Sequence, residues 1–396
     1  MDIELLEGEQ LKLGDGKAPD VTMSDDDINK KYREGEIRIV TEQARYPLSA
    51  ISSMVHNTDE YKMNPEYQRR HRWSNAKRSA LIESLIMNVP LPPVFLYEYE
   101  YSCYEVMDGL QRLTAISSFY ENEFALEGLM EWPELNGKRY HELPRLVRQG
   151  IDRRYISSII LLNETAKTPE QAEQMKQMVF KRINSGGELL TSQEARNANF
   201  DGPLNRLCIQ LSLNTALCKT WGIPVHVDGS QGIHTNRAAN KLFKTMYDVE
   251  LVLRFFANRQ RDELKSSSLA VYLDRFLEQG NAMPKAVLDT LGDMFTQTID
   301  LAYEIFEEQA FYLYRERKGS WYWLERPTLA VYDPMMQVLS QNLDNREILV
   351  GNKDQICEEI KTFYQDNYEV FGGRNVNAAD QKLRENLLSE FFKRFI

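Results

Sequence analysis

The sequence lacks several features that would assign it to familiar classes of protein. No apolar run approaches the length needed to cross a bilayer, and the acidic start Met1-Asp-Ile-Glu4 does not resemble a signal peptide. The four cysteines form no C-x-x-C pair and have no histidine at metal-ligand spacing, which argues against a structural zinc site. We therefore expect a cytoplasmic protein with reduced cysteines and no contact with a membrane.

The chain also lacks an excess of positive charge, because 59 Asp and Glu residues outnumber 48 Lys and Arg residues and give a net charge of −11. That balance argues against general affinity for nucleic acid, since counterion release requires a concentrated basic surface. Any contact with DNA must therefore come from a local basic patch. Two clusters are candidates, although such clusters most often form a solvated face: Arg69, Arg70, His71, Arg72, Lys77 and Arg78, and further along Arg145, Arg148, Arg153 and Arg154.

The length and composition indicate an α+β protein of more than one domain. The chain has 396 residues and 42% hydrophobic content, which is enough for two well-packed cores. Residues 1–33 are acidic and poor in large apolar groups, so we expect a mobile leader with one short helix. Strand-like alternation and helical spacing follow one another over residues 34–200, whereas residues 201–396 show helical stripes. The predicted architecture is a mixed domain followed by an all-α domain.

Local patterns place the elements of the mixed domain. Apolar alternation predicts strands, apolar residues three and four apart predict helices, and Ser or Thr before such a stripe predicts an N-cap. The expected strands cover residues 36–40, 94–97, 99–106 and 156–162. The expected helices cover residues 47–55, 75–88 and 169–183 and a stretch after Arg112 that runs to about Tyr120, with an N-cap at Ser74 and a capping box from Thr191 to Glu194.

The stretch Tyr104–Ser118 changes from a strand-like to a helical pattern within a few residues, at Asp108 and Gly109. A strand, a tight glycine turn and a helix would present the unpaired N–H groups of the helix start, where phosphate can bind. Asp108 lies where a carboxylate could hold Mg²⁺ or orient a water, and Gln111 and Arg112 lie where they could bond phosphate oxygens. The structural alternative is that Asp108 is an N-cap and Arg112 a solvated side chain.

A second polar segment ends the helix predicted over residues 169–183. Arg182 and Asn184 adjoin the turn Ser185-Gly-Gly187, where backbone and side chains can jointly surround a polar ligand. The alternative is an Asn184 C-cap beside an exposed Arg182. Glu194 has the spacing of a cap partner for Thr191, and we assign it no further role.

Three spaced blocks of the sequence resemble one known family. Together they resemble the N-terminal domain of GmrSD-type modification-dependent restriction proteins, the DUF262 family, a branch of the ParB/sulfiredoxin-like superfamily. Leu110 departs from the family pattern, which more commonly has Gln there. The blocks are Asn64-Pro-Glu-Tyr-Gln-Arg-Arg-His-Arg-Trp73 with the following helix and its Pro90–Pro93 exit, Asp108-Gly-Leu-Gln-Arg-Leu-Thr114, and Phe180-Lys-Arg-Ile-Asn-Ser-Gly-Gly-Glu-Leu-Leu-Thr-Ser-Gln-Glu-Ala-Arg-Asn-Ala198.

The resemblance implies a ParB/sulfiredoxin-like domain that binds and hydrolyses a nucleoside triphosphate with Mg²⁺ in bacterial anti-phage defence, and a DNA-nicking activity. In that reading Asp108, Gln111 and Arg112 are catalytic, and Asp108 also holds the metal. Arg69 and Arg72 would add positive charge to the ligand site. The implied nucleotide-binding residues are Gly109, Arg69, Arg72, Arg182, Asn184 and Gly187.

The C-terminal part of the sequence resembles the helical half of stand-alone members of this family, most clearly over Asn236–Phe256. Related proteins often carry an HNH-like nuclease domain, but none of the five histidines follows His234, and no Asp-His-x-x-Pro signature is present. Two hypotheses follow. The chain hydrolyses nucleotides, or it is a non-catalytic nucleotide- or DNA-sensing module. In either case we expect a separately encoded effector protein as its partner.

Overall fold

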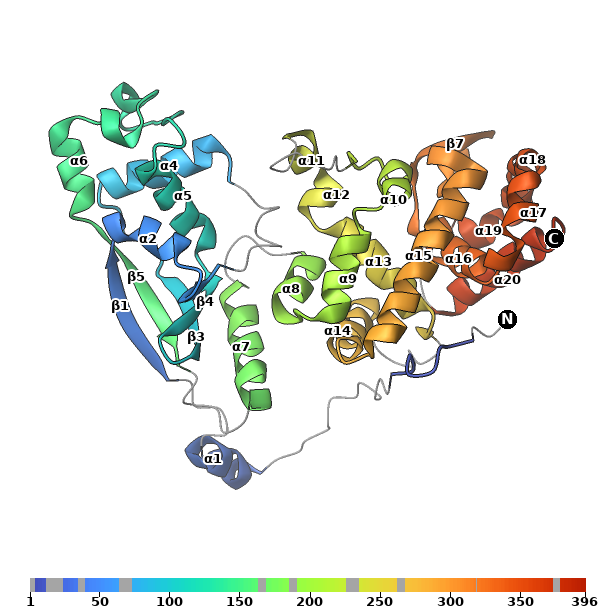
Figure 1. Cartoon of the computed structure of the whole chain (residues 1–396), viewed down its shortest axis with the longest axis horizontal. Coiled ribbons are helices and arrows are strands. Elements are labelled where there is room, and N and C mark those ends of the chain that lie inside the picture. The colour runs from blue at the N-terminus through green and yellow to red at the C-terminus, as the bar shows by residue number, and fades with distance from the viewer. Residues whose placement is uncertain are drawn as a thin grey trace. The chain divides into compact units, whose positions relative to one another are not determined.

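The computed structural model divides the chain into two compact units, and each is described by itself (Figure 1). One unit comprises residues 21–190, and the other comprises residues 191–396 together with residues 1–20. The structure describes residues 4–11, 24–34, 40–63, 73–162, 169–184, 191–225, 235–261, 268–317, 319–372 and 378–396.

The unit of residues 21–190 is built on a mixed five-stranded sheet with the order β1-β5-β3-β4-β2. β1 and β5 are antiparallel, as are β3 and β4, whereas β3–β5 and β2–β4 are parallel pairs. The mixture arises because a two-residue turn at Tyr101–Ser102 joins β3 to β4, while helical connections join the other strands. The strands are β1 (Thr41–Pro47), β2 (Tyr61–Lys62), β3 (Val94–Glu100), β4 (Cys103–Asp108) and β5 (Tyr155–Leu161).

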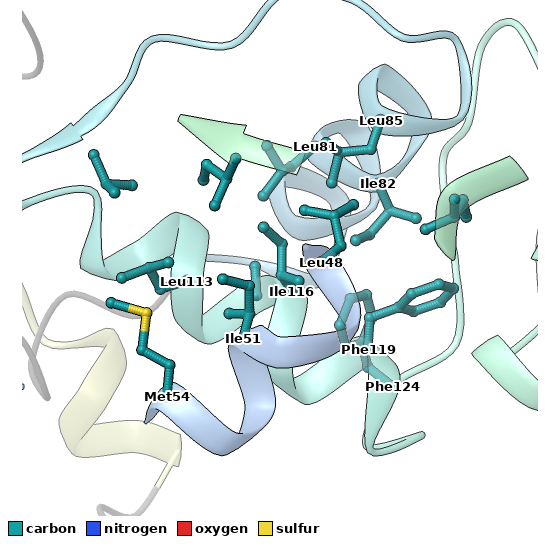
Figure 2. Packing of buried hydrophobic residues seen from close by; sticks show 14 of the residues in the cluster. Leu48, Ile51, Met54, Leu81, Ile82, Leu85, Leu113, Ile116, Phe119 and Phe124 are labelled. Carbon is teal, nitrogen blue, oxygen red and sulfur yellow. The ribbon is translucent and has the colours of Figure 1, made fainter. Parts of the chain in front are cut away.

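Four of the helices of this unit, α2, α4, α5 and α6, contribute to one hydrophobic core (Figure 2). Ile51, Leu81 and Ile116 come from three different helices and are almost fully buried there. Ser74 caps the second of these helices by accepting from the backbone N–H of Lys77, as predicted. The helices are α1 (Asp25–Glu34), α2 (Ile51–His56), α4 (Asn75–Ile86), α5 (Leu110–Tyr120), α6 (Arg145–Asp152) and α7 (Pro169–Asn184), with short 3-10 turns at Leu48–Ala50, Pro133–Leu135 and Tyr140–Glu142.

Most of the expected elements of the mixed domain are confirmed. The first strand differs, because β1 begins at Thr41, and residues 36–39 lie outside the described part of the chain. α7 lies against β4, where the Lys176 Nζ is 2.7 Å from the Glu105 Oε2. The helix that carries Arg182 is therefore attached to the strand that ends at Asp108.

The unit of residues 191–396 is mainly helical, and the capping box from Thr191 to Glu194 is present at its first helix, as predicted. Its core includes the long helices α13, α15 and α16, whose residues are buried on most sides. The helices are α8 (Ser192–Asn199), α9 (Pro203–Leu211), α10 (Thr215–Thr220), α11 (Thr235–Ala239), α12 (Lys241–Lys244), α13 (Tyr247–Asn258), α14 (Leu269–Gly280), α15 (Lys285–Phe306), α16 (Leu329–Ser340), α17 (Arg346–Gly351), α18 (Lys353–Asp366), α19 (Tyr368–Phe371) and α20 (Ala378–Phe392), with 3-10 turns at Glu307–Gln309 and Leu343–Asn345.

The prediction of an all-α domain is wrong in one respect. β6 (Tyr312–Arg317) and β7 (Ser320–Pro327) form an antiparallel hairpin between α15 and α16. Gly319 has a φ of +80°, which suits the short hairpin turn between the paired residues Arg317 and Ser320. The aromatic residues on both sides of this turn favour strands, so the local preference overrides the helical surroundings.

The short helix expected in the leader of residues 1–33 is present as α1, but the beginning of the leader differs from the prediction. Residues 4–11 pack within the helical unit, where Glu9 is 1% exposed and pairs with Arg259 at 2.6 Å. The amide of Gln260 donates to the backbone carbonyl of Glu9. The units divide at Leu190 and Thr191, whereas the sequence placed the boundary at residue 200. The ion pair of Glu9 explains why residues 4–11 pack within the helical unit, because a fully buried carboxylate requires a cationic partner.

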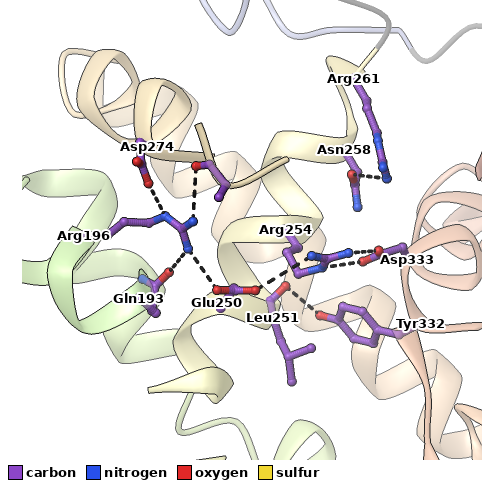
Figure 3. Close-up of polar contacts among 11 residues, drawn as sticks. Gln193, Arg196, Glu250, Leu251, Arg254, Asn258, Arg261, Asp274, Tyr332 and Asp333 are labelled. Atoms are coloured by element: carbon purple, nitrogen blue, oxygen red, sulfur yellow. Dashed lines mark hydrogen bonds and ion pairs between the residues drawn. The ribbon is translucent and has the colours of Figure 1, made fainter. Parts of the chain in front are cut away.

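A network of ion pairs around the buried Arg196 and Arg254 connects four helices of this unit (Figure 3). Arg196 of α8 donates to the Glu250 carboxylate on α13 at 2.9 Å and to Asp274 on α14 at 2.7 Å. Arg254, one turn after Glu250, bonds both carboxylate oxygens of Asp333 on α16. Burial lowers the pKa of Arg254, but Asp333 and Glu250 more than offset that effect, so its pKa is raised. The network fixes α8 within the helical unit.

Candidate functional site

The turn between β4 and α5 has the geometry predicted from the sequence. β4 ends at Asp108, Gly109 is the N-cap, and α5 begins at Leu110. Gly109 has a φ of +95°, a left-handed backbone conformation that residues other than glycine rarely adopt. A Cβ atom at this position would lie 2.5 Å from the Cγ1 of Val94 on β3. Glycine is therefore required here both by the backbone conformation and by the close packing of β3.

The start of α5 has no side-chain cap, because its N-cap residue is glycine. The alternative in which Asp108 is the N-cap is therefore wrong, and its carboxylate makes a different contact. An uncapped helix start directs backbone N–H groups and the positive end of the helix dipole toward the space before it. This arrangement can bind an anionic group such as a phosphate.

Arg112 lies one helical turn after Asp108 and binds it directly. The Nη2 of Arg112 donates to the Oδ2 of Asp108 at 2.8 Å. The same guanidinium donates to the backbone carbonyls of Pro92 and Pro93, which lead into β3. Burial lowers the pKa of Arg112, and the Asp108 carboxylate opposes this effect. Arg112 thus joins the entry of β3 to the end of β4 and orients the carboxylate.

Gln111 links the turn to the beginning of α4. Its side-chain oxygen lies 3.4 Å from the backbone nitrogen of Trp73, which donates to it. Trp73 directly precedes Ser74, the residue that caps α4. The side-chain oxygen of Gln111 and the guanidinium of Arg112 thus contact the protein's own main chain, and the prediction that these two residues bind phosphate oxygens stays a prediction.

Asp108 is the most accessible acidic group of the turn. Its side chain is 37% exposed, and within the described part of the chain Arg112 is the hydrogen-bond partner of only one of its two oxygens. The described residues contain no group of three His, Cys, Asp or Glu side chains that could hold a metal ion. A Mg²⁺ ion here would have to be shared between one carboxylate, the phosphates of a ligand and water, which is a common arrangement for Mg²⁺.

The structure brings together Asp108, Gly109, Gln111 and Arg112, but it does not describe every predicted site residue. Arg69, Arg72 and Gly187 lie outside the described residues, as does the side chain of Asn184. Arg182 is exposed near the end of α7. The carbonyls of Pro92 and Pro93 are parts of the site that the sequence reasoning missed. The spacing of Asp108 and Arg112 is a signal that predicts their ion pair.

Comparison with known proteins gives one match. Residues 51–200 match the family model described as the GmrSD restriction endonuclease, N-terminal domain. No curated protein and no solved structure matches the chain. A search of the described residues finds no helix with the length and apolar character of a membrane span. The matched range contains the whole β4–α5 turn and the three blocks that carry the resemblance, and this part of the chain is a GmrSD-type N-terminal domain.

Proposed function

We propose that the domain binds a nucleoside triphosphate at the β4–α5 turn and hydrolyses it with Mg²⁺, as a component of a bacterial anti-phage or restriction-type system. The observation that carries this proposal is the position of Asp108. Its partly exposed carboxylate ends a strand immediately before a helix start that has no side-chain cap. The helix start and the Asp108 carboxylate act together on a polyphosphate. The helix start attracts the phosphates, and a carboxylate-bound Mg²⁺ neutralises their charge.

Each residue of the turn has a role in this proposal. Gly109 permits the close approach of phosphate to the backbone. Asp108 would hold Mg²⁺, which would reduce the negative charge on the phosphates during hydrolysis. Arg112 restricts the orientation of Asp108 through the 2.8 Å contact, and Gln111 fixes the beginning of α4 beside the turn. We therefore assign Arg112 and Gln111 mainly to positioning within the catalytic turn.

The remaining residues predicted to contact the nucleotide stay part of the proposal. Arg69 and Arg72 would supply positive charge from the segment before α4, and Arg182, Asn184 and Gly187 would contact the ligand from the end of α7. A ParB/sulfiredoxin-like fold is supported by the mixed sheet in which a strand leads through a glycine turn into a helix. DNA nicking and a separately encoded effector are proposed on the family resemblance alone.

A second function is favoured by the way in which the turn's own polar groups are engaged. Arg112 donates to two main-chain carbonyls and to Asp108, and Gln111 accepts from Trp73. These contacts leave Asp108 as the group with an exposed reactive atom. A site with one such group suits binding and sensing of a nucleotide that controls an effector, without turnover.

One experiment separates the two functions. The purified protein is incubated with each of the four ribonucleoside triphosphates and Mg²⁺, with and without DNA, and both nucleotide binding and phosphate release are measured. Hydrolysis predicts phosphate release that is lost in Asp108→Asn and retained in Asp59→Asn, a control that removes the same charge from an exposed residue of the same unit. Binding without release supports the sensing function, and the absence of binding for all four nucleotides contradicts both.

A further inference from the structure

An exposed apolar patch lies where the loop of residues 127–134 packs on α4. Met130 is 84% exposed, and Trp132 is exposed as well. Met87, also exposed, lies on the same side, because it follows Glu83 by one helical turn on the face of α4 that holds the loop. Monomeric proteins rarely expose several large apolar side chains together, and Met and Trp are enriched at protein interfaces. The composition of the patch is therefore that of an interaction surface.

A buried carboxylate fixes the loop that carries this patch. Glu83 of α4 is 6% exposed, and its two oxygens accept from three successive backbone N–H groups. Oε1 accepts from Glu131 at 2.8 Å and from Trp132 at 2.9 Å, and Oε2 accepts from Met130 at 3.4 Å. Fixing the backbone in advance lowers the entropy that a binding partner would have to remove. The patch is thus preorganised for binding.

Acidic side chains surround the patch. Glu127, Glu131 and Glu134 are all exposed, and residues 127–134 include no lysine or arginine. Complementary surfaces place opposite charges against each other, and like charges across an interface are strongly unfavourable. The partner of this patch therefore needs an apolar side chain with positive charge beside it.

The helix α6 of the same unit presents a surface of that kind. Val147 and Ile151 attach one side of α6 to the hydrophobic core. Leu146 lies on the outer side and is 80% exposed. Arg153 lies two helical turns after Leu146 on the same side, and Arg145 directly precedes it, and both arginines are exposed. An exposed leucine thus lies between two exposed arginines.

The single carboxylate of α6 does not cancel this positive charge. One oxygen of Asp152 accepts from the hydroxyl groups of Tyr120 at 3.0 Å and Tyr140 at 2.8 Å, which draws the carboxylate toward α5. Arg145, Arg148 and Arg153 also outnumber it. The outer side of α6 is therefore basic, whereas the loop of residues 127–134 is acidic.

We propose that the patch of Met130 and Trp132 on one copy of the chain binds the outer side of α6 on a second copy. Leu146 packs against the apolar patch, and the arginines beside it face the glutamates of the loop. The two surfaces differ, so the contact is heterologous and joins copies head to tail in a ring or an open chain. Both surfaces belong to the unit of residues 21–190, so the contact does not depend on the arrangement of the two units.

Other occupants fit the patch less well. A lipid surface or a nucleic acid carries negative charge, which the three glutamates of the loop repel. A symmetric contact of the patch with the same patch on a second copy would bring two sets of glutamates together, which is unfavourable for the same reason. The charges of this chain therefore favour contact between two different surfaces.

Sedimentation velocity of the full chain over a range of protein concentrations tests the proposal. The parent should associate as its concentration rises, and less strongly at high salt, because salt screens the ion pairs. Met130→Lys places a positive charge opposite the arginines of α6, and Leu146→Glu places a negative charge opposite the glutamates of the loop. Each should weaken association by roughly tenfold or more. Tyr101→Lys, which changes an exposed aromatic residue in the β3–β4 turn, is the matched control and should associate like the parent.

A mixture of the two variants tests the head-to-tail arrangement. The Leu146→Glu chain keeps an intact patch and the Met130→Lys chain keeps an intact α6, so the mixture should associate although neither variant does so alone. Thermal unfolding and nucleotide binding like those of the parent confirm that the variants are folded. The proposal is overturned by a parent that stays monomeric at every concentration, by losses no larger than that of the control, by a loss in Met130→Lys alone, or by a mixture that stays monomeric.

Discussion

Gly109→Ala should be one of the most damaging single substitutions in the GmrSD-type domain. At a φ of +95° an alanine is strained, which costs about 1–2 kcal/mol in the left-handed region. The added Cβ would also lie 2.5 Å from the Val94 Cγ1 and 3.1 Å from the Arg112 Nη2. Displacing packed neighbours costs a further 1–3 kcal/mol, roughly. The expected loss in the free energy of unfolding is therefore about 2–5 kcal/mol.

Gly128→Ala is the matched control for this substitution. Gly128 also has a positive φ, of +67°, but no atom lies within 4 Å of the position that its Cβ would occupy. Gly128→Ala should lower the free energy of unfolding only by the strain of the left-handed backbone, about 1–2 kcal/mol. Urea unfolding of both variants measures the difference, and Gly109→Ala/Val94→Ala tests its origin, because it removes the clashing methyl group. If Gly109→Ala costs no more than Gly128→Ala, the close approach of β3 to the turn is refuted.

Three further predictions concern buried and titratable groups. Glu9→Ala should cost about 3–5 kcal/mol by leaving Arg259 buried without its partner, and a denaturation midpoint equal to that of the parent would show that residues 4–11 do not stabilise the helical unit. Asp333→Ala should cost a similar amount, because Arg254 is 3% exposed, and unchanged urea unfolding would contradict this. Burial and the Asp152 carboxylate raise the pKa of Tyr140 to about 12, so its contribution to stability is present below pH 10 and is lost as the pH rises toward 12. A difference in tyrosinate absorbance between the parent and Tyr140→Phe measures this pKa.

The features of the fold that were predicted correctly have local sequence signals. Ser74 and Thr191 precede helical stripes at N-cap spacing, and both cap the helices that follow them. Asp108 and Gly109 lie where a strand pattern gives way to a helical one, and the turn is found there. In each case the interaction joins residues within one helical turn, so the sequence contains the necessary information.

The features that were missed depend on residues far apart in the chain or on competing local preferences. Glu9 and Arg259 are 250 residues apart, so no local pattern indicates that the first residues join the helical unit. Arg112 donates to the carbonyl of Pro93, which precedes it by 19 residues, and backbone acceptors have no sequence signature. The β6–β7 hairpin has a two-residue turn with Gly319, but the helical stripes around it led to an all-α prediction.

The role of Asp108 is the central claim, and the Mg²⁺ dependence of nucleotide binding tests it most directly. Calorimetry measures the affinity of the parent and of Asp108→Asn for a non-hydrolysable triphosphate, with and without Mg²⁺. Asn retains an oxygen that can accept from Arg112 but removes the charge that would hold the metal. The account predicts that Mg²⁺ strengthens binding by the parent and has little effect on binding by the folded variant. Equal strengthening by Mg²⁺ in both proteins would contradict it.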